Sequence, residues 1–308
     1  MSTLRELLHD YLAMRRALGF KLHSDGTALL AFVGFMEHEQ ADAISTDLAV
    51  VWAKQPTAVR PEQWARRLGY VRGFARYCRA FDERTEIPPS QLLPFPRRSP
   101  RPYFFTDEDI ETLLQGALRL PAKDELANHT YHCLFGLLSV AGLRIGEALA
   151  LKVDEVDLVE GILTLRSTKF GKSRLVPLHA TSVAVLADYR RRRDHFPAGR
   201  AVPYWFIHAQ GTRLSYDSVS DVFHRLTAAL PEQSGRRRPR LHDLRHHFAI
   251  STVVRWYREG QDVEQRLPVL SAFLGHVEVR DTYWYLSACP ELLGVAKDRL
   301  ERRWEGVS

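Results

Sequence analysis

A proline-rich segment divides the chain into two parts. Residues 87–102, IPPSQLLPFPRRSPRP, contain six prolines in sixteen positions. Proline lacks a backbone N–H and fixes φ, so such a run forms neither a continuous helix nor an interior strand. We expect a basic, extended linker at residues 93–103, between an N-terminal domain of residues 1–92 and a C-terminal domain of residues 104–308. A chain of 308 residues is long enough for two domains.

The N-terminal domain has the periodicity of a small helical bundle. Apolar residues recur at three- and four-residue spacing from Thr3 to Phe81, and the pattern breaks at 19–26, 41–46 and 56–61. This predicts four helices. Residues 1–92 hold 12 Lys/Arg against 11 Asp/Glu, net +1, which leaves +5 of the total +6 for residues 93–308. The modest excess permits an anionic partner such as nucleic acid without requiring one.

The second domain mixes helices with a short β region. Thr106 precedes the acidic run DED and is a good N-cap. An apolar helix is expected through 131–140. Residues 153–179 are then rich in β-branched residues, with turns at Glu160-Gly161 and Phe170-Gly171, which predicts three short strands. Helical periodicity returns from Ser182. The expected fold class is mainly α with a small antiparallel sheet (α+β).

Cysteine usage and the apolar runs indicate a cytoplasmic protein. Cys78, Cys133 and Cys289 lie far apart, so they suggest neither a disulfide framework nor a zinc site. The apolar run at 133–143 is shorter than the roughly 18 residues of a membrane span. The first ten residues carry charges where a signal peptide has its apolar core. We expect no membrane partner.

Polar residues are concentrated in four apolar segments of the second domain: GLRIGEALAL, TKFGKSRLVPL, LHDLRHHFAI and LGHVEVRDTYWYL. Together they supply arginines that can bind phosphate oxygens in a bidentate manner and histidines that can transfer protons near neutral pH. They also supply a lysine that can protonate a leaving oxygen and a tyrosine that can act as a nucleophile. These residue types indicate phosphoryl transfer through a covalent phosphotyrosine. The residues are Arg144, Glu147, Lys169, His242, Arg245, His276 and Tyr285.

Each segment also has a plainer interpretation when taken alone. Arg144 and Glu147 can form a simple ion pair at i,i+3 spacing. His242 and His246 have the spacing of a metal-binding pair, but no glutamate of an HExxH motif and no convincing third ligand accompany them. We therefore expect no metal site and no cofactor.

The four segments, in this order and spacing, resemble the tyrosine site-specific recombinases, the phage integrase family. The resemblance covers the catalytic domain at about residues 104–300. The N-terminal domain is similar in layout to the family's core-binding domain, a helical, SAM-like domain that binds DNA.

The resemblance implies a role for each site residue. Arg144 and Arg245 would clamp the scissile phosphate, and Lys169 would protonate the 5′-oxygen leaving group, with Lys172 as its competitor. His242 would assist proton transfer and His276 would bind the phosphate. Tyr285 would be the nucleophile that forms a 3′-phosphotyrosine. Glu147 is expected to orient neighbouring groups.

Tyr283, two residues before Tyr285, is the alternative nucleophile. The spacing from the LGH motif favours Tyr285. Tyr283 and Trp284 are instead expected to pack their helix onto the domain.

The resemblance also implies what the enzyme acts on. Four protomers would surround two double-stranded DNA recombination sites and exchange strands through a four-way junction, without ATP or metal. The biological setting would be integration, excision or transposition of a mobile element, with partner recombinases or DNA-bending proteins as further partners. On DNA the protein would be associated with the bacterial nucleoid.

Basic residues outside the catalytic set are candidate DNA contacts: Arg97, Arg98, Arg101, Lys172, Arg174, Arg236, Arg237, Arg238 and Arg240. An amphipathic C-terminal helix, with Leu292, Val295, Leu300 and Trp304 on one face, can dock on a neighbouring protomer or on its own domain.

Two other functions compete with a recombinase. One is a DNA-binding accessory protein of the same fold that does not cleave, although the complete catalytic set argues against it. The other is an enzyme like the type IB topoisomerases, which the helical N-terminal domain and the LGH motif disfavour.

Overall fold

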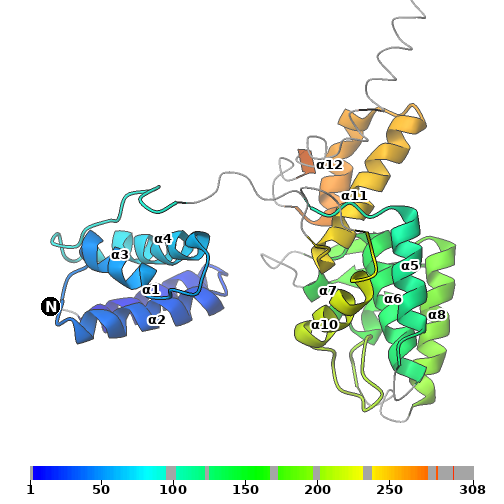
Figure 1. Ribbon diagram of the computed structural model, residues 1–308, viewed down its shortest axis with the longest axis horizontal. Coiled ribbons are helices and arrows are strands. Elements are labelled where there is room, and N and C mark those ends of the chain that lie inside the picture. Colours follow the sequence, from blue (N-terminus) through cyan, green and yellow to red (C-terminus); the bar gives the residue numbers. More distant parts are fainter. Residues whose placement is uncertain are drawn as a thin grey trace, which may run out of the picture. The chain divides into compact units, whose positions relative to one another are not determined.

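The computed structural model describes residues 3–94, 102–121, 125–166, 173–196, 202–231, 238–276, 282–283 and 294. The chain forms two compact units, residues 1–99 and 100–308 (Figure 1). Among the described residues, no helix has the length and apolar character needed to cross a membrane.

Unit 1 consists of the four helices that the periodicity predicts. They are α1 (Leu4–Ala17), α2 (His23–His38), α3 (Thr46–Lys54) and α4 (Pro61–Cys78). The hydroxyl of Thr3 accepts a hydrogen bond from the Glu6 N–H (3.2 Å) and caps α1, and Pro61 occupies the first turn of α4, where its missing N–H costs nothing. Phe32, Trp52 and Phe74 are almost completely buried at the centre of this bundle.

The proline-rich segment begins on the surface of unit 1. Arg72 donates hydrogen bonds to the carbonyls of Pro88 and Pro89 (2.7 Å each), and Leu93 is buried in the core. The first residue of the predicted linker therefore packs with unit 1. Residues 95–101, with the candidate DNA contacts Arg97, Arg98 and Arg101, lie outside the described residues.

Unit 2 is mainly helical with one small sheet, which confirms the predicted fold class. Its first part comprises α5 (Asp107–Leu118), α6 (Glu125–Ala141), α7 (Ile145–Ala150) and the 3₁₀ turn η1 (Val153–Glu155). The sheet contains β1 (Val156–Asp157), β2 (Ile162–Leu165) and β3 (Arg174–Pro177), antiparallel in the order β1-β2-β3. The helices α8 (Ala180–His195), α10 (Tyr216–Thr227), α11 (Leu241–Arg258) and α12 (Val263–Leu274) follow.

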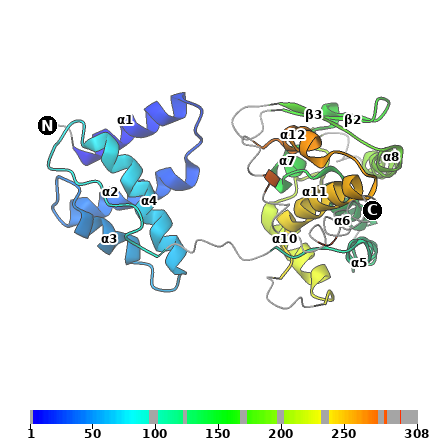
Figure 2. The same ribbon diagram turned by 90° about the horizontal axis from the view of Figure 1, so that it is seen from above.

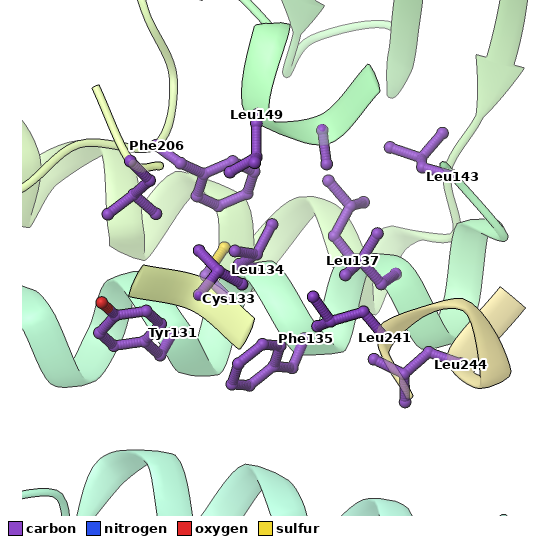
Figure 3. Close-up of a cluster of buried hydrophobic side chains, with 14 of the residues drawn as sticks. Tyr131, Cys133, Leu134, Phe135, Leu137, Leu143, Leu149, Phe206, Leu241 and Leu244 are labelled. Atoms are coloured by element: carbon purple, nitrogen blue, oxygen red, sulfur yellow. The ribbon is translucent and has the colours of Figure 1, made fainter. Parts of the chain in front are cut away.

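The core of unit 2 fixes the rotation of α11. Helix α6 packs against α5, α8 and α11. Leu134 and Phe135 of α6 belong to the same buried cluster as Leu241 and Leu244 of α11 (Figure 3). Because residues three apart share a helix face, burying Leu241 and Leu244 determines where the residues beside them, His242 and Arg245, must point.

The sheet places β3 beside the end of α12. Figure 2 shows β2 and β3 along one edge of unit 2, with α7 and α12 close to them, and β3 contacts α12. Three segments far apart in the sequence therefore meet here: the start of α7, the start of β3 and the end of α12.

Candidate active site

Arg144 enters the site at the N-terminus of α7. Gly142 takes a left-handed conformation (φ +58°) after α6, so the chain turns sharply before Arg144. The Arg144 N–H donates to Glu147 Oε2 (3.0 Å), and its Nη1 donates to Glu147 Oε1 (2.8 Å). Its Nη2 donates to the carbonyl of Gly275 (2.8 Å). The Arg144 side chain is 26% exposed, so its guanidinium is held by these hydrogen bonds and still reaches solvent.

Arg245 lies in the first turns of α11 and is buried, with 1% of its surface exposed. Its Nη1 donates to the carbonyl of Gly142 and its Nη2 to the carbonyl of Leu274, both at 2.7 Å. Carbonyls at a helix C-terminus lack intrahelical partners and carry partial negative charge. Leu274 ends α12 and Gly275 follows it, so Arg144 and Arg245 are anchored on consecutive carbonyls of one helix end.

His276 follows directly after these carbonyls. Gly275 adopts a left-handed conformation (φ +69°) that ends α12 and turns the chain. The His276 Nδ1 lies 2.8 Å from the hydroxyl of Thr282, which is buried. The structure thus brings together Arg144, Arg245 and His276, three of the predicted site residues, around the end of α12.

His242 lies one turn before Arg245 and is exposed. Its ring meets that of His246 edge to face, with 4.6 Å between the centroids. Crowding of the ring by protein atoms, followed by the positive charges of Arg245, Arg240 and Arg144, lowers the pKa of His242 to about 4. The DNA-free protein therefore holds a neutral His242 at neutral pH, and a neutral imidazole can accept a proton.

Glu147 joins the arginines into a network. Its carboxylate also accepts from Arg174 Nη1 (3.0 Å to Oε1) and Nη2 (2.7 Å to Oε2). Burial alone would raise the pKa of Glu147, but its bonds to Arg174 and Arg144 outweigh burial and lower that pKa to about 2. Glu147 is thus ionised, and its orienting role stays a prediction.

Arg174 has a partner that the sequence analysis missed. We predicted it as a DNA contact, yet its side chain is 11% exposed and its guanidinium binds Glu147. Arg240 similarly donates to the buried Asp243 (3.1 Å), while Arg238 is exposed. Contact of these arginines with DNA stays a prediction. The only sequence signal for the ion pair is that both residues lie within recognised motifs.

Several predicted residues lie outside the described residues: Lys169, Lys172, Arg236, Arg237 and Tyr285, the predicted nucleophile. Trp284 and the apolar residues of the predicted C-terminal helix do as well. Tyr283 is described and is 48% exposed. Its packing onto the domain stays a prediction, and Tyr283 stays a competitor for the nucleophile.

The described residues of the predicted site lie outside a large cavity of unit 2. A cavity of about 1120 Å³ in unit 2 is lined by residues from α6, α11 and the start of α5, including Phe104, Phe248 and Val254. Its lining contains none of Arg144, Arg245, His242 and His276. The described residues hold no cluster of three or more His, Cys, Asp or Glu that could bind a metal ion.

Comparison with known proteins identifies the family. The sequence model of the phage integrase family matches residues 103–291, more than half of the chain. The chain belongs to the phage integrase family. It is a tyrosine recombinase, an enzyme that breaks and rejoins DNA strands.

Relatives and solved structures agree. A Sinorhizobium fredii protein named as the integrase/recombinase y4rB is 52% identical over 99% of both chains. The tyrosine recombinase XerD of Caulobacter vibrioides is 30% identical over 76% of this chain and 73% of its own. The integrase of the transposon Tn1549, solved with transposon right-end DNA, has the same fold at 16% identity: its TM-score is 0.68, over 98% of this chain and 99% of that chain.

Proposed function

We propose that this tyrosine recombinase cleaves and rejoins site-specific DNA through a covalent 3′-phosphotyrosine at Tyr285. One observation carries the proposal: Arg144, Arg245 and His276 converge at the end of α12, with both guanidiniums anchored on adjacent backbone carbonyls. A preorganised pair of cations suits the charge that develops on the phosphate oxygens as a fifth oxygen approaches phosphorus.

The cleavage step transfers a phosphoryl group from a deoxyribose oxygen to the tyrosine. The Tyr285 oxygen attacks phosphorus and loses its proton with the help of neutral His242. The bond from phosphorus to the 5′-oxygen breaks, and that oxygen takes a proton from Lys169, with Lys172 as the alternative donor. The tyrosine ester keeps the energy of the broken phosphodiester. An incoming 5′-hydroxyl can therefore reverse the step without ATP, and neither a metal nor a cofactor takes part.

Strand exchange needs several copies of this chemistry. We propose that four protomers hold two duplexes and exchange one pair of strands, then the other, through a four-way junction. The support is by likeness: one structure with the same fold, at 16% identity, is a lambda integrase tetramer bound to a Holliday junction. The Tn1549 integrase and the y4rB relative favour a mobile element as the setting. Partner recombinases or DNA-bending proteins would bind together with this enzyme at the recombination sites.

Covalent trapping tests the nucleophile. A nicked suicide substrate loses its 5′-hydroxyl fragment by diffusion, so the wild type should accumulate as a protein–DNA adduct. Tyr285→Phe should bind the DNA and form no adduct, whereas the matched variant Tyr283→Phe should still form it. An adduct with Tyr285→Phe, or its loss only with Tyr283→Phe, would show that Tyr285 is not the nucleophile.

Adduct trapping, plasmid relaxation and plasmid recombination together separate the alternatives. A silent DNA-binding protein forms no adduct with any variant. An enzyme like a type IB topoisomerase relaxes supercoiled DNA but leaves two recombination sites unexchanged. A recombinase converts a plasmid with two sites into exchanged products, and chelator leaves that conversion unchanged.

Arginine variants test the phosphate clamp. Arg144→Ala and Arg245→Ala should each slow cleavage by about 100-fold or more while DNA affinity changes little, because each acts mainly on the transition state. Arg238→Ala, at an exposed arginine, should weaken binding more than cleavage. Equal losses of binding and cleavage at Arg144 and Arg245 would reduce them to ordinary phosphate contacts.

A further inference from the structure

Arg174 is held inside the protein at the point where three segments meet. It is the first residue of β3, and its guanidinium binds both oxygens of Glu147 at 3.0 Å and 2.7 Å. The guanidinium also packs against the backbone at Gly275, where an added Cβ would lie 2.7 Å from Arg174 Nη1. One side chain therefore links the start of β3 to α7 and to the end of α12.

The side chains of Glu147, Arg144 and Arg174 do not balance in charge. Glu147 supplies one negative charge, and the side chains of Arg144 and Arg174 both donate hydrogen bonds to it. The three side chains together keep a net positive charge. If Arg174 were neutral, Glu147 would compensate Arg144 alone, and the attraction of that pair for a phosphate would largely cancel.

Arg144 and Arg174 differ in exposure and in how they bind Glu147. Arg144 also donates to the Gly275 carbonyl and remains 26% exposed, whereas Arg174 is 11% exposed and binds the carboxylate with both terminal nitrogens. A bidentate pair is the stronger arrangement for a carboxylate. Arg174 is thus the principal counter-charge of Glu147, and Arg144 is the arginine that faces outward.

We propose that Arg174 is a positioning residue for the cleavage reaction. By compensating the charge of Glu147, it leaves Arg144 oriented by the carboxylate yet still positive toward the scissile phosphate. This inference rests on the proposed function, because it assigns Arg144 to the phosphate. It gives Arg174 a role through Arg144, in place of the direct DNA contact that its sequence position suggests.

The test first removes the charge of Arg174 alone and then removes the charges of Arg174 and Glu147 together. Arg174→Met removes the charge and keeps much of the volume, and it should slow single-turnover cleavage of the suicide substrate by about 10- to 100-fold, as is typical when the residue that orients a site group is removed. DNA affinity should change little, because Arg174 acts through Arg144 on the cleavage step. Arg174→Lys keeps the charge and should fall between Met and wild type. The exposed Arg166, at the end of β2, provides the matched control: Arg166→Met should cleave like the wild type.

The decisive variant removes both charges. In Glu147→Gln/Arg174→Met no carboxylate remains to neutralise Arg144, so the double variant should cleave at least about fivefold faster than Arg174→Met. A role in packing alone predicts a double variant no faster than the single one. A second readout replaces the scissile phosphate by an uncharged methylphosphonate. The defect of Arg174→Met should shrink there, because the phosphate charge that Arg144 would meet is gone.

The outcomes separate this proposal from the one beneath it. A wild type that forms no adduct overturns the proposed function, and this inference with it. A wild type that cleaves, together with Arg174→Met that cleaves equally fast or a double variant that is no faster than Arg174→Met, overturns the role of Arg174 and leaves the proposed function standing. If Arg174→Met does not fold, Arg174→Lys and the double variant are compared with Glu147→Gln, and a double variant slower than Glu147→Gln by the full 10- to 100-fold contradicts the charge argument.

Discussion

Replacing Gly142 by alanine should destabilise unit 2 and weaken the proposed phosphate clamp. Gly142 has φ +58°, and an added Cβ would lie 2.5 Å from Phe248 Cδ1 and 2.9 Å from Leu274 Cδ2. Its carbonyl also accepts the hydrogen bond from Arg245 Nη1. One methyl group therefore strains the turn after α6, overfills the contact with α11 and α12, and pushes on the anchor of Arg245.

The magnitude follows from two separate costs. A non-glycine residue in the left-handed region loses about 1–2 kcal/mol. Inserting a methyl group into a packed contact costs about 1–3 kcal/mol, because ring and leucine side chains on both sides must shift. Together the loss is about 2–5 kcal/mol, a large part of the roughly 5–15 kcal/mol that stabilises a typical domain.

Urea denaturation near neutral pH, followed by circular dichroism, measures this loss. Gly146→Ala is the matched control, four residues along the chain. It lies within α7, has an ordinary φ, and an added Cβ there meets no atom within 4 Å. Alanine should be better by about 0.5–1 kcal/mol at that helical position. If Gly142→Ala unfolds at the same urea concentration as the wild type, the packing argument is wrong. If it is destabilised yet cleaves at the wild-type rate, the Gly142 carbonyl does not hold Arg245.

Three further outcomes follow from the structure. NMR titration of the DNA-free protein should show His242 taking up its proton near pH 4, and phosphate binding should raise that midpoint; a midpoint of about 6.5 without DNA would contradict the cationic site. The pKa of His246 in the folded protein is also lowered, to about 3. Below the ordinary histidine pKa of about 6.5, the unfolded chain therefore binds more protons at His246 than the folded protein does. The free energy of unfolding should fall as pH falls from about 6.5 toward 4, and urea titrations that show no change over this range would refute this. Phe32→Ala should destabilise unit 1 by about 3–5 kcal/mol, since Phe32 is fully buried with its ring edge-on to Trp52 (5.1 Å between centroids); a loss below about 1 kcal/mol would contradict this.

Local patterns were sufficient for most of the fold. Thr106 was predicted as an N-cap, and its hydroxyl accepts the Asp109 N–H at 3.1 Å. The turn at Glu160-Gly161 was predicted from its residue types, and Gly161 has φ +67° between β1 and β2. These features depend on neighbours a few residues away, which is the distance over which capping and turn chemistry operate.

The site was predictable in its residues and not in its contacts. The motifs named Arg144, Arg245 and His276, but nothing in the sequence said that the two arginines would be anchored on the carbonyls of Gly275 and Leu274. Backbone carbonyls are present at every residue, so no residue type marks the one that a guanidinium will find. The ion pair of Arg174 was missed for a related reason, because its pairing with Glu147 joins positions 27 residues apart.

The end of α12 explains how two arginines can stand ready before DNA arrives. Like charges in one site repel each other, and a pair held only by solvent would separate until a phosphate drew it together. Here the carbonyls of Leu274 and Gly275, left unpaired by the end of the helix, place partial negative charge against each guanidinium. Glu147, whose side chain is nearly buried, adds a full negative charge against Arg144. The repulsion is offset inside the protein. Under the proposed function, little of the binding energy of DNA is then needed to bring the two arginines together, and more of it is available to stabilise the transition state.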